Sequence, residues 1–285
     1  MSAQEMSFWD HLEELRWMLF RIIIALAIFA VAAFLVMPWF FDHIIMAPAK
    51  SDFVLYTWMC KLSTQFSFLP NFCDNNFKVD MINIELTAPF LRHLSTSGWV
   101  ALVLICPYIL YEVWRFISPA LYEHEKKNVR IVFLLGSVMF FIGCLFSYII
   151  IFPMALRFLY SYNLSDVIHN EVSLDSYLDN FISLILVMGV VFEMPLISWL
   201  LSQIGILKKS FFRKYRRHAV VILVIAAAVI TPTGDPFNLS IVFFPLYGLY
   251  ELSILFVKEG EPDEDDEEEK ASLKRVKLWK KKKST

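Results

Sequence analysis

The sequence predicts an all-α membrane protein with six transmembrane helices, the fifth and sixth of them short, and with both termini in the cytoplasm. Three observations predict this class. Hydrophobic residues make up 58% of the 285-residue chain, more than a soluble domain of this size would tolerate. Long apolar runs recur along the chain, and Lys and Arg gather in alternate connectors between these runs.

Six apolar runs mark the predicted spans. They occupy residues 17–37, 96–117, 131–152, 181–204, 219–230 and 237–257. At a rise of about 1.5 Å per residue, most runs are long enough for a hydrocarbon core of about 30 Å. The fifth run reaches only about 18 Å, so a re-entrant segment is an open alternative there. The first run is too long for the apolar part of a secretory signal, so we expect a retained span.

Basic residues orient these spans through the positive-inside bias. Two connectors, 118–130 and 205–218, are rich in Lys and Arg and are predicted to be cytoplasmic. The outward segments are poor in them and include a long periplasmic loop at 38–95. We therefore expect one multi-pass membrane domain at 1–257. Residues 258–285 form an acidic and then lysine-rich cytoplasmic tail, which we expect to be disordered.

Four cysteines are present, and their spacing is not that of a metal site or a redox motif. Cys106 and Cys144 fall within spans, where a small buried hydrophobe is the expected role. Cys60 and Cys73 fall in the outward loop, which would face an oxidising compartment in a bacterial cell. We predict a disulfide between these two.

Glu193 is the most informative single residue, because it lies in the fourth apolar run. An ionisable group at that depth costs about 2.5 to 3.5 kcal/mol on insertion scales. It must be uncharged, hydrated from a groove, or partnered by another helix. We favour hydration from a concave surface; a proton relay and a structural hydrogen bond are the alternatives.

Acidic side chains also cluster at the cytoplasmic ends of the first two spans. Glu14 precedes the first span, and Glu125 follows the second. Carboxylates near an interface bind guanidinium groups well, because the planar fork of arginine makes two parallel charge-assisted hydrogen bonds. The alternative is that Glu14 offsets the dipole of its own helix and Glu125 pairs with nearby lysines.

Several motifs resemble one family in sequence order. The stretches HLEELR at 11–16, PYILYEVWRFISPAL at 107–121 and EHE at 123–125 resemble TatC, the membrane receptor of the twin-arginine protein translocase. FEMP at 192–195 and TPTGD at 231–235 resemble two further TatC motifs. The resemblance covers about residues 7–257 and implies a concave, glove-like architecture. The outward loop is longer than expected, and a double proline after the fifth span is replaced by PTG.

The resemblance also implies roles for individual residues. Glu14 and Glu125 would each receive one guanidinium of a twin-arginine signal peptide, with Arg16 and Phe116 beside them. Glu193 would face the concave surface where the peptide inserts and near which partner subunits dock. Two residues match family positions on the periplasmic side, namely Pro48 and Asp235.

These matches imply a non-enzymatic receptor and core subunit that helps to export folded proteins using the proton gradient. The expected partners are TatA- and TatB-type single-span proteins, the lipid bilayer and further copies of the chain. The chain shows no nucleophile–base or nucleotide motif, and we expect no cofactor, metal or nucleic acid. A proton-coupled transporter of a small solute, with Glu193 as carrier carboxylate, is the alternative, and a passive scaffold is a third option.

Overall fold

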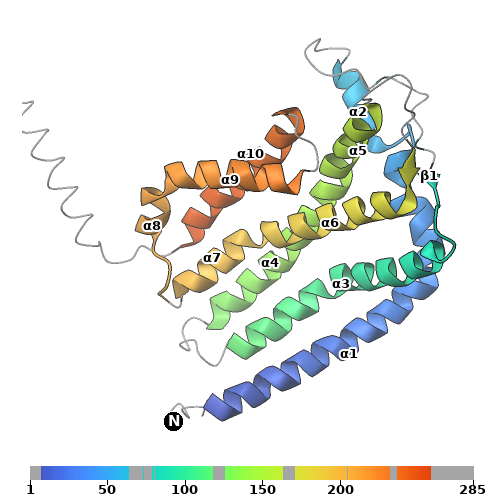
Figure 1. Ribbon diagram of the computed structural model, residues 1–285. Coiled ribbons are helices and arrows are strands. Elements are labelled where there is room, and N and C mark those ends of the chain that lie inside the picture. The colour runs from blue at the N-terminus through green and yellow to red at the C-terminus, as the bar shows by residue number, and fades with distance from the viewer. Residues whose placement is uncertain are drawn as a thin grey trace, which may run out of the picture.

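The computed structural model describes residues 8–63, 73, 79, 81–117, 126–162, 171–203, 205–231 and 236–257, and these form a bundle of long helices (Figure 1). The bundle helices are α1 (Phe8–Phe40), α3 (Ala88–Ile117), α4 (Lys126–Phe146), α6 (Leu174–Phe192), α7 (Met194–Gln203), α9 (Arg216–Ile230) and α10 (Pro236–Phe256). At one end lie α2 (Val54–Ser63), α5 (Phe152–Ser161) and a short parallel pair, β1 (Met81–Ile82) and β2 (Val172–Ser173). The opposite end carries α8 (Lys209–Lys214).

Within the described residues, five helical stretches are long and apolar enough to cross a membrane. They are Trp9–Ala49, Ala88–Ile117, Phe133–Ser161, Leu174–Gln203 and Pro236–Phe256. The prediction of a membrane protein with several spanning helices is therefore confirmed. Because α9 has 15 residues and reaches only about 22 Å, a count of six crossings stays a prediction.

The sixth predicted span is not short, so this part of the prediction was wrong. Helix α10 has 21 residues, which correspond to about 32 Å and suffice for the hydrocarbon core. It begins at Pro236, where a missing backbone N–H costs nothing, and it continues through Pro245. Membrane helices tolerate an internal proline because neighbouring groups satisfy the freed carbonyl.

The fourth predicted span is divided into two helices. Helix α6 ends at Phe192, Glu193 forms a turn, and α7 begins at Met194. Pro195 explains the break, because it has no N–H to donate to the carbonyl of Val191, four residues earlier, and its ring crowds that carbonyl. The proline therefore places the one acidic residue of this stretch at an interruption in the helix.

The ends of the bundle agree with the predicted alternation of connectors. The start of α1, the end of α3, the basic helix α8 and the end of α10 lie together at one end (Figure 1). The loop side, with α2, α5 and β1, lies at the other end. The described parts of the basic connectors, residues 126–130 and 205–218, thus share one side of the bundle, which the positive-inside bias predicts to be the cytoplasmic side.

Small residues allow α4 and α6 to pack closely along the middle of the bundle. A Cβ atom at Gly143 of α4 would lie 2.7 Å from the Met188 carbonyl oxygen and 2.8 Å from Phe192 Cβ. A Cβ atom at Gly189 of α6 would lie 2.8 Å from Cys144 Sγ. Close approach of backbones through small residues is a main source of helix association in lipid, where no hydrophobic force drives it.

Buried tyrosine hydroxyls tie together the outer end of the molecule. Tyr56 Oη lies 3.0 Å from the carbonyl oxygen of Pro48 and 3.1 Å from that of Pro153, and it donates to this pair. Burial raises the pKa of Tyr56, so the hydroxyl keeps its proton as a donor. In the same region Cys60 and Cys73 form a disulfide with an S–S distance of 2.10 Å. Its formation in the cell stays a prediction.

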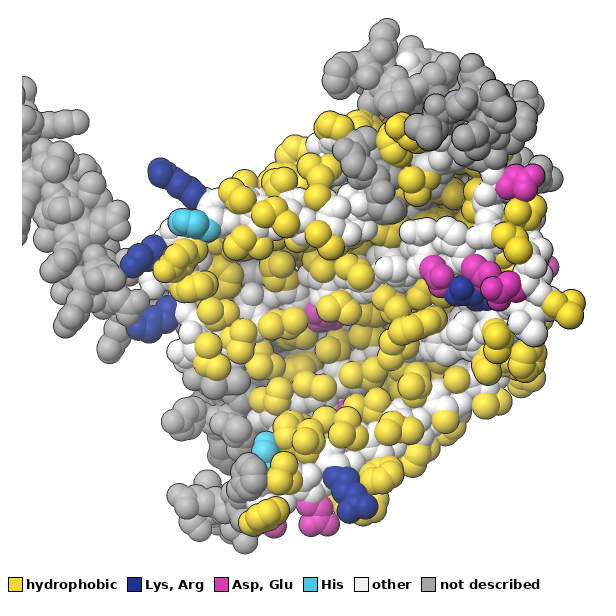
Figure 2. All heavy atoms as spheres, in the orientation of Figure 1, with side chains coloured by type: hydrophobic (Ala, Val, Ile, Leu, Met, Phe, Trp, Pro, Cys, Tyr) yellow, Lys and Arg dark blue, Asp and Glu magenta, His cyan; other side chains and the backbone are white. Residues whose placement is uncertain are grey.

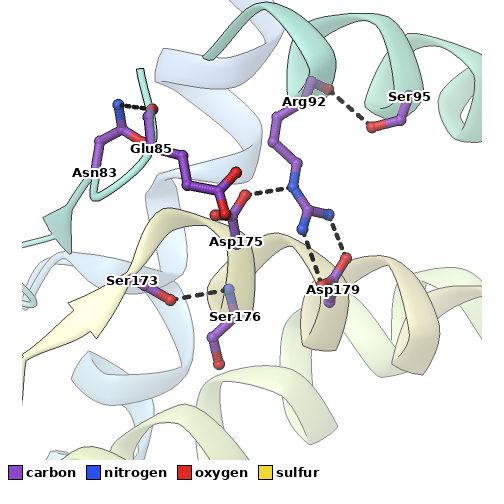
Figure 3. Close-up of polar contacts among 8 residues, drawn as sticks. All are labelled: Asn83, Glu85, Arg92, Ser95, Ser173, Asp175, Ser176 and Asp179. Atoms are coloured by element: carbon purple, nitrogen blue, oxygen red, sulfur yellow. Dashed lines mark hydrogen bonds and ion pairs between the residues drawn. The ribbon is translucent and has the colours of Figure 1, made fainter. Parts of the chain in front are cut away.

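An ion-pair cluster joins α3 to α6 near this outer end (Figure 3). Arg92 Nε donates to Asp175 Oδ1 at 2.5 Å, and Arg92 Nη2 donates to Asp179 Oδ2 at 3.1 Å. The Arg92 side chain is 26% exposed, and Asp179 is 64% exposed. Solvent therefore screens much of the attraction between these charges.

Replacing Arg92 with glutamine should lower the stability of the protein by about 1 kcal/mol, because two neighbouring aspartates lose their common partner. Thermal unfolding in detergent micelles would measure this change, and the difference should shrink at about 1 M salt. Arg213→Gln on the exposed side of α8 serves as the control. An Arg92→Gln protein as stable as the parent at low salt would contradict this prediction.

Candidate functional site

The inner ends of α1 and α3 meet through an aromatic contact. The His11 ring stacks on the Phe116 ring with 4.2 Å between centroids and 19° between planes. This contact brings Phe116 beside the first turns of α1, where Glu14 and Arg16 follow. The structure thus gathers three of the predicted binding residues at one end of the α1–α3 seam.

The carboxylate of Glu14 at this end of the seam is available to accept hydrogen bonds. It is half-buried, and among the residues that the structure describes it makes no hydrogen bond or ion pair. Arg16 is exposed and lies over the Phe20 ring, with 5.5 Å from Cζ to the centroid. Glu125 and Asp235 lie outside the described residues.

A second acidic residue lies deeper in the same seam, and sequence analysis missed its role. Both oxygens of Glu112 accept from Arg21 Nε at 3.0 Å, and Arg21 Nη2 donates to Glu112 Oε2 at 2.8 Å. Tyr108 Oη donates to Glu112 Oε1 at 2.9 Å. The Glu112 side chain is only 2% exposed. The sequence did contain a signal for this pair, because Arg21 in the first span and Glu112 in the second lie at a similar depth.

Glu193 is almost fully enclosed, with 7% of its surface exposed. Neither carboxyl oxygen has a hydrogen-bond partner among the described residues. A Cβ atom at Gly136 of α4 would lie 2.9 Å from Glu193 Oε2 and 2.5 Å from Leu196 Cδ2. Because Gly136 has no side chain, there is room for the carboxyl group of Glu193 beside α4. The side chain lies in the interior between helices rather than on an open, hydrated surface.

An apolar groove of about 340 Å³ runs along the bundle between α1, α3, α4 and α6. Its lining includes Phe40, Trp99, Val103, Phe141, Leu145 and Ile182, and Glu193 is not among the lining residues. Figure 2 shows the face in this view covered mainly by hydrophobic side chains, with most charged side chains near the two ends of the bundle. Such a surface suits lipid or an apolar peptide segment.

The remaining predicted positions have simpler surroundings. Pro48 is buried in a short 3₁₀ turn, Ala47–Ala49, and its carbonyl accepts from Tyr56. Within the described ranges, no group of three or more His, Cys, Asp or Glu side chains could hold a metal ion. Among the predicted and newly found acids that the structure describes, Glu14 makes no ion pair, Glu112 is paired with Arg21, and Glu193 has no hydrogen-bond partner.

Comparisons with known proteins identify the family of the chain. Residues 10–245 match the family described as Sec-independent protein translocase protein (TatC). A TatC protein of Blattabacterium sp. subsp. Periplaneta americana (strain BPLAN) is 35% identical over 255 residues, covering 88% of this chain and 94% of that protein. A TatC protein of Helicobacter pylori is 36% identical over 197 residues, covering 69% of this chain and 77% of that protein.

Solved structures lead to the same family. A crystal structure described as Twin Arginine Translocase Receptor- TatC superposes with a TM-score of 0.64 at 30% identity, covering 86% of this chain and 97% of that one. A second crystal structure of this receptor, in DDM, gives a TM-score of 0.66 at 30% identity. The family match spans most of the chain, and the relatives are matched over most of their length. The chain therefore belongs to the TatC family of Sec-independent protein translocase proteins.

Proposed function

We propose that this TatC-family protein binds twin-arginine signal peptides at the cytoplasmic face of a bacterial inner membrane. Glu14 receives one guanidinium of the arginine pair and Glu125 receives the other, with Arg16 and Phe116 completing the site. Both termini lie in the cytoplasm. The protein helps to export folded proteins, and the transmembrane proton gradient supplies the energy.

The state of Glu14 is the observation that carries this proposal. Its carboxylate is half-buried and unpaired among the described residues, beside an aromatic stack at the end of two spanning helices. Two arginines that enter such an interfacial site lose hydration, so only geometrically matched carboxylates make the exchange favourable. The likeness to crystal structures described as a twin-arginine translocase receptor supports the same role.

TatC-family proteins are non-enzymatic components of a protein translocase that work with other Tat components. For this chain we infer that TatA- and TatB-type single-span proteins, and further copies of the chain, dock on the spanning helices. Glu193 and the region of α9 are the proposed contact regions, with Pro48 and Asp235 on the periplasmic side. Small and polar residues on these helices suit such helix–helix contacts in lipid.

Photo-crosslinking of a signal peptide to membranes that contain this protein tests the receptor role. We expect a peptide with two arginines to crosslink to the parent protein and a peptide with two lysines to crosslink at least about tenfold less, because ammonium cannot make the bidentate contact. Glu14→Ala and Glu125→Ala should each reduce the arginine-dependent crosslink by a similar factor.

Glu13→Ala, the neighbouring acid, provides the matched control and should leave the crosslink unchanged. Equal crosslinking of all variants would place the site elsewhere in the molecule. Proton flux through the protein in the absence of any exported cargo would instead favour a proton-coupled solute transporter.

A further inference from the structure

We propose that Arg21, Glu112 and Tyr108 form a positioning cluster that holds α1 against α3 and thereby sets the geometry of the signal-peptide site. This inference rests on the proposed function, because it concerns the same site. The three residues do not contact the peptide in this proposal. They act through Glu14 and Phe116, which lie on the same helix faces.

Helical spacing connects the cluster to the site. Glu14 and Arg21 are seven residues apart on α1, which is two turns, so both lie on one face. Tyr108, Glu112 and Phe116 follow each other at intervals of four residues on α3 and also share a face. The His11–Phe116 stack and the Arg21–Glu112 pair are therefore two contacts on one seam between α1 and α3.

The geometry of the Arg21–Glu112 pair suits a rigid connection. The guanidinium reaches both carboxyl oxygens, which fixes the relative orientation of the two side chains as a single contact would not. Tyr108 adds a third hydrogen bond to the same carboxylate. In lipid the helices have no hydrophobic force to hold their register, so a bonded pair of charges is an effective way to fix it.

The cluster also determines which acid remains open to a ligand. Arg21 and Tyr108 occupy both oxygens of Glu112, and only 2% of its side chain is exposed. Glu14 makes no hydrogen bond or ion pair with a described residue, and Arg21 reaches it only through a weaker charge interaction. Arg21 therefore acts as an internal guanidinium that satisfies the deeper acid, and the shallower acid stays available for an arginine from outside.

Binding of a fluorescent signal peptide to the purified full-length protein, reconstituted in lipid nanodiscs, tests this role. We expect Arg21→Gln and Glu112→Gln each to weaken binding of the twin-arginine peptide by about tenfold, the size that the loss of a hydrogen bond to a charged group gives. Both variants should also reduce the preference for the twin-arginine peptide over a twin-lysine peptide. Arg21→Lys keeps the charge but loses the bidentate contact with Glu112, so its binding should fall between that of the parent and that of Arg21→Gln.

Arg92→Gln is the matched control, because it breaks another ion pair of α3, at the outer end and away from the site. It should lower thermal stability and leave peptide affinity and preference unchanged. Tyr108→Phe is a milder variant for the case in which Arg21→Gln or Glu112→Gln does not accumulate, and it should weaken binding by about threefold through the loss of one hydrogen bond.

The outcomes separate the two proposals. If the Arg21 and Glu112 variants bind the peptides with the affinity and preference of the parent protein, the positioning role is overturned and the receptor role remains intact. Where those variants do not accumulate, the same result with Tyr108→Phe would lead to the same conclusion. An equal loss of binding in Arg92→Gln would also overturn it, since any loosening of α3 would then suffice. A parent protein that binds both peptides alike would overturn the receptor role itself, and the positioning role with it.

Discussion

Replacing Glu193 with methionine is expected to make the protein more stable and less active. The carboxyl group is 7% exposed, and both of its oxygens lack a hydrogen-bond partner among the described residues. An unsatisfied buried polar group costs about 1 to 3 kcal/mol, and methionine fills a similar volume without that cost. Unfolding of the purified protein in detergent should therefore shift to a higher temperature by several degrees.

The same substitution should lower the export of a reporter protein that carries a twin-arginine signal by about tenfold or more. The 7% of the Glu193 surface that stays exposed is where a partner helix would contact it. Interhelical polar contacts in membranes contribute about 1 to 2 kcal/mol, and the methionine variant would lose such a contact. Glu193→Gln keeps a polar group of the same size and is the matched control. A drop in stability on Glu193→Met would show that the carboxyl group makes a structural hydrogen bond, as the alternative interpretation holds.

Replacing Gly143 with alanine should destabilise the protein by about 1 to 3 kcal/mol, the usual range for overpacking a tight contact. The added carbon would lie 2.7 Å from the Met188 carbonyl oxygen and 2.8 Å from Phe192 Cβ. The carbonyl is backbone and cannot turn aside, so α4 and α6 must move apart. Thermal unfolding and the steady-state amount of protein in the membrane would both report this loss.

Gly98→Ala on α3 provides the control for this prediction. No atom lies within 4 Å of a Cβ built at Gly98. Alanine favours helix over glycine by up to about 1 kcal/mol, so this variant should be neutral or slightly stabilising. Equal behaviour of the Gly98 and Gly143 variants would contradict close packing of α4 on α6.

The membrane class and most helix positions follow from the sequence because hydrophobicity over a span-length window is a local property. The run at 96–117 ends where α3 ends, and the run at 237–257 differs from α10 by one residue at each end. The family resemblance, carried by motifs at the helix ends, is confirmed by the comparisons. Cys60 and Cys73 also lie together as a disulfide in the structure. The sequence argument for this pairing was only that both fall in a loop expected to face an oxidising compartment.

The contacts between helices could not be predicted in the same way, because they depend on which faces meet. Glu112 was read only as part of a motif, although its position within a span calls for a partner as strongly as that of Glu193 does. Gly136 and Gly143 look unremarkable in an apolar run, yet they determine where Glu193 and Phe192 fit. The local pattern of apolar residues shows how far a helix extends. The register between two helices can be read only from the three-dimensional structure.

The short helix α9 has a consequence for the surrounding lipid. It has 15 residues beside the 21 of α10, so the two differ in length by about 9 Å. If α9 crosses the membrane as predicted, acyl chains next to it must compress, or shorter lipids must collect there, at a cost of a fraction of a kcal/mol for each ångström. The barrier to a polar polypeptide would then be lower along this wall of the protein, before any other subunit arrives.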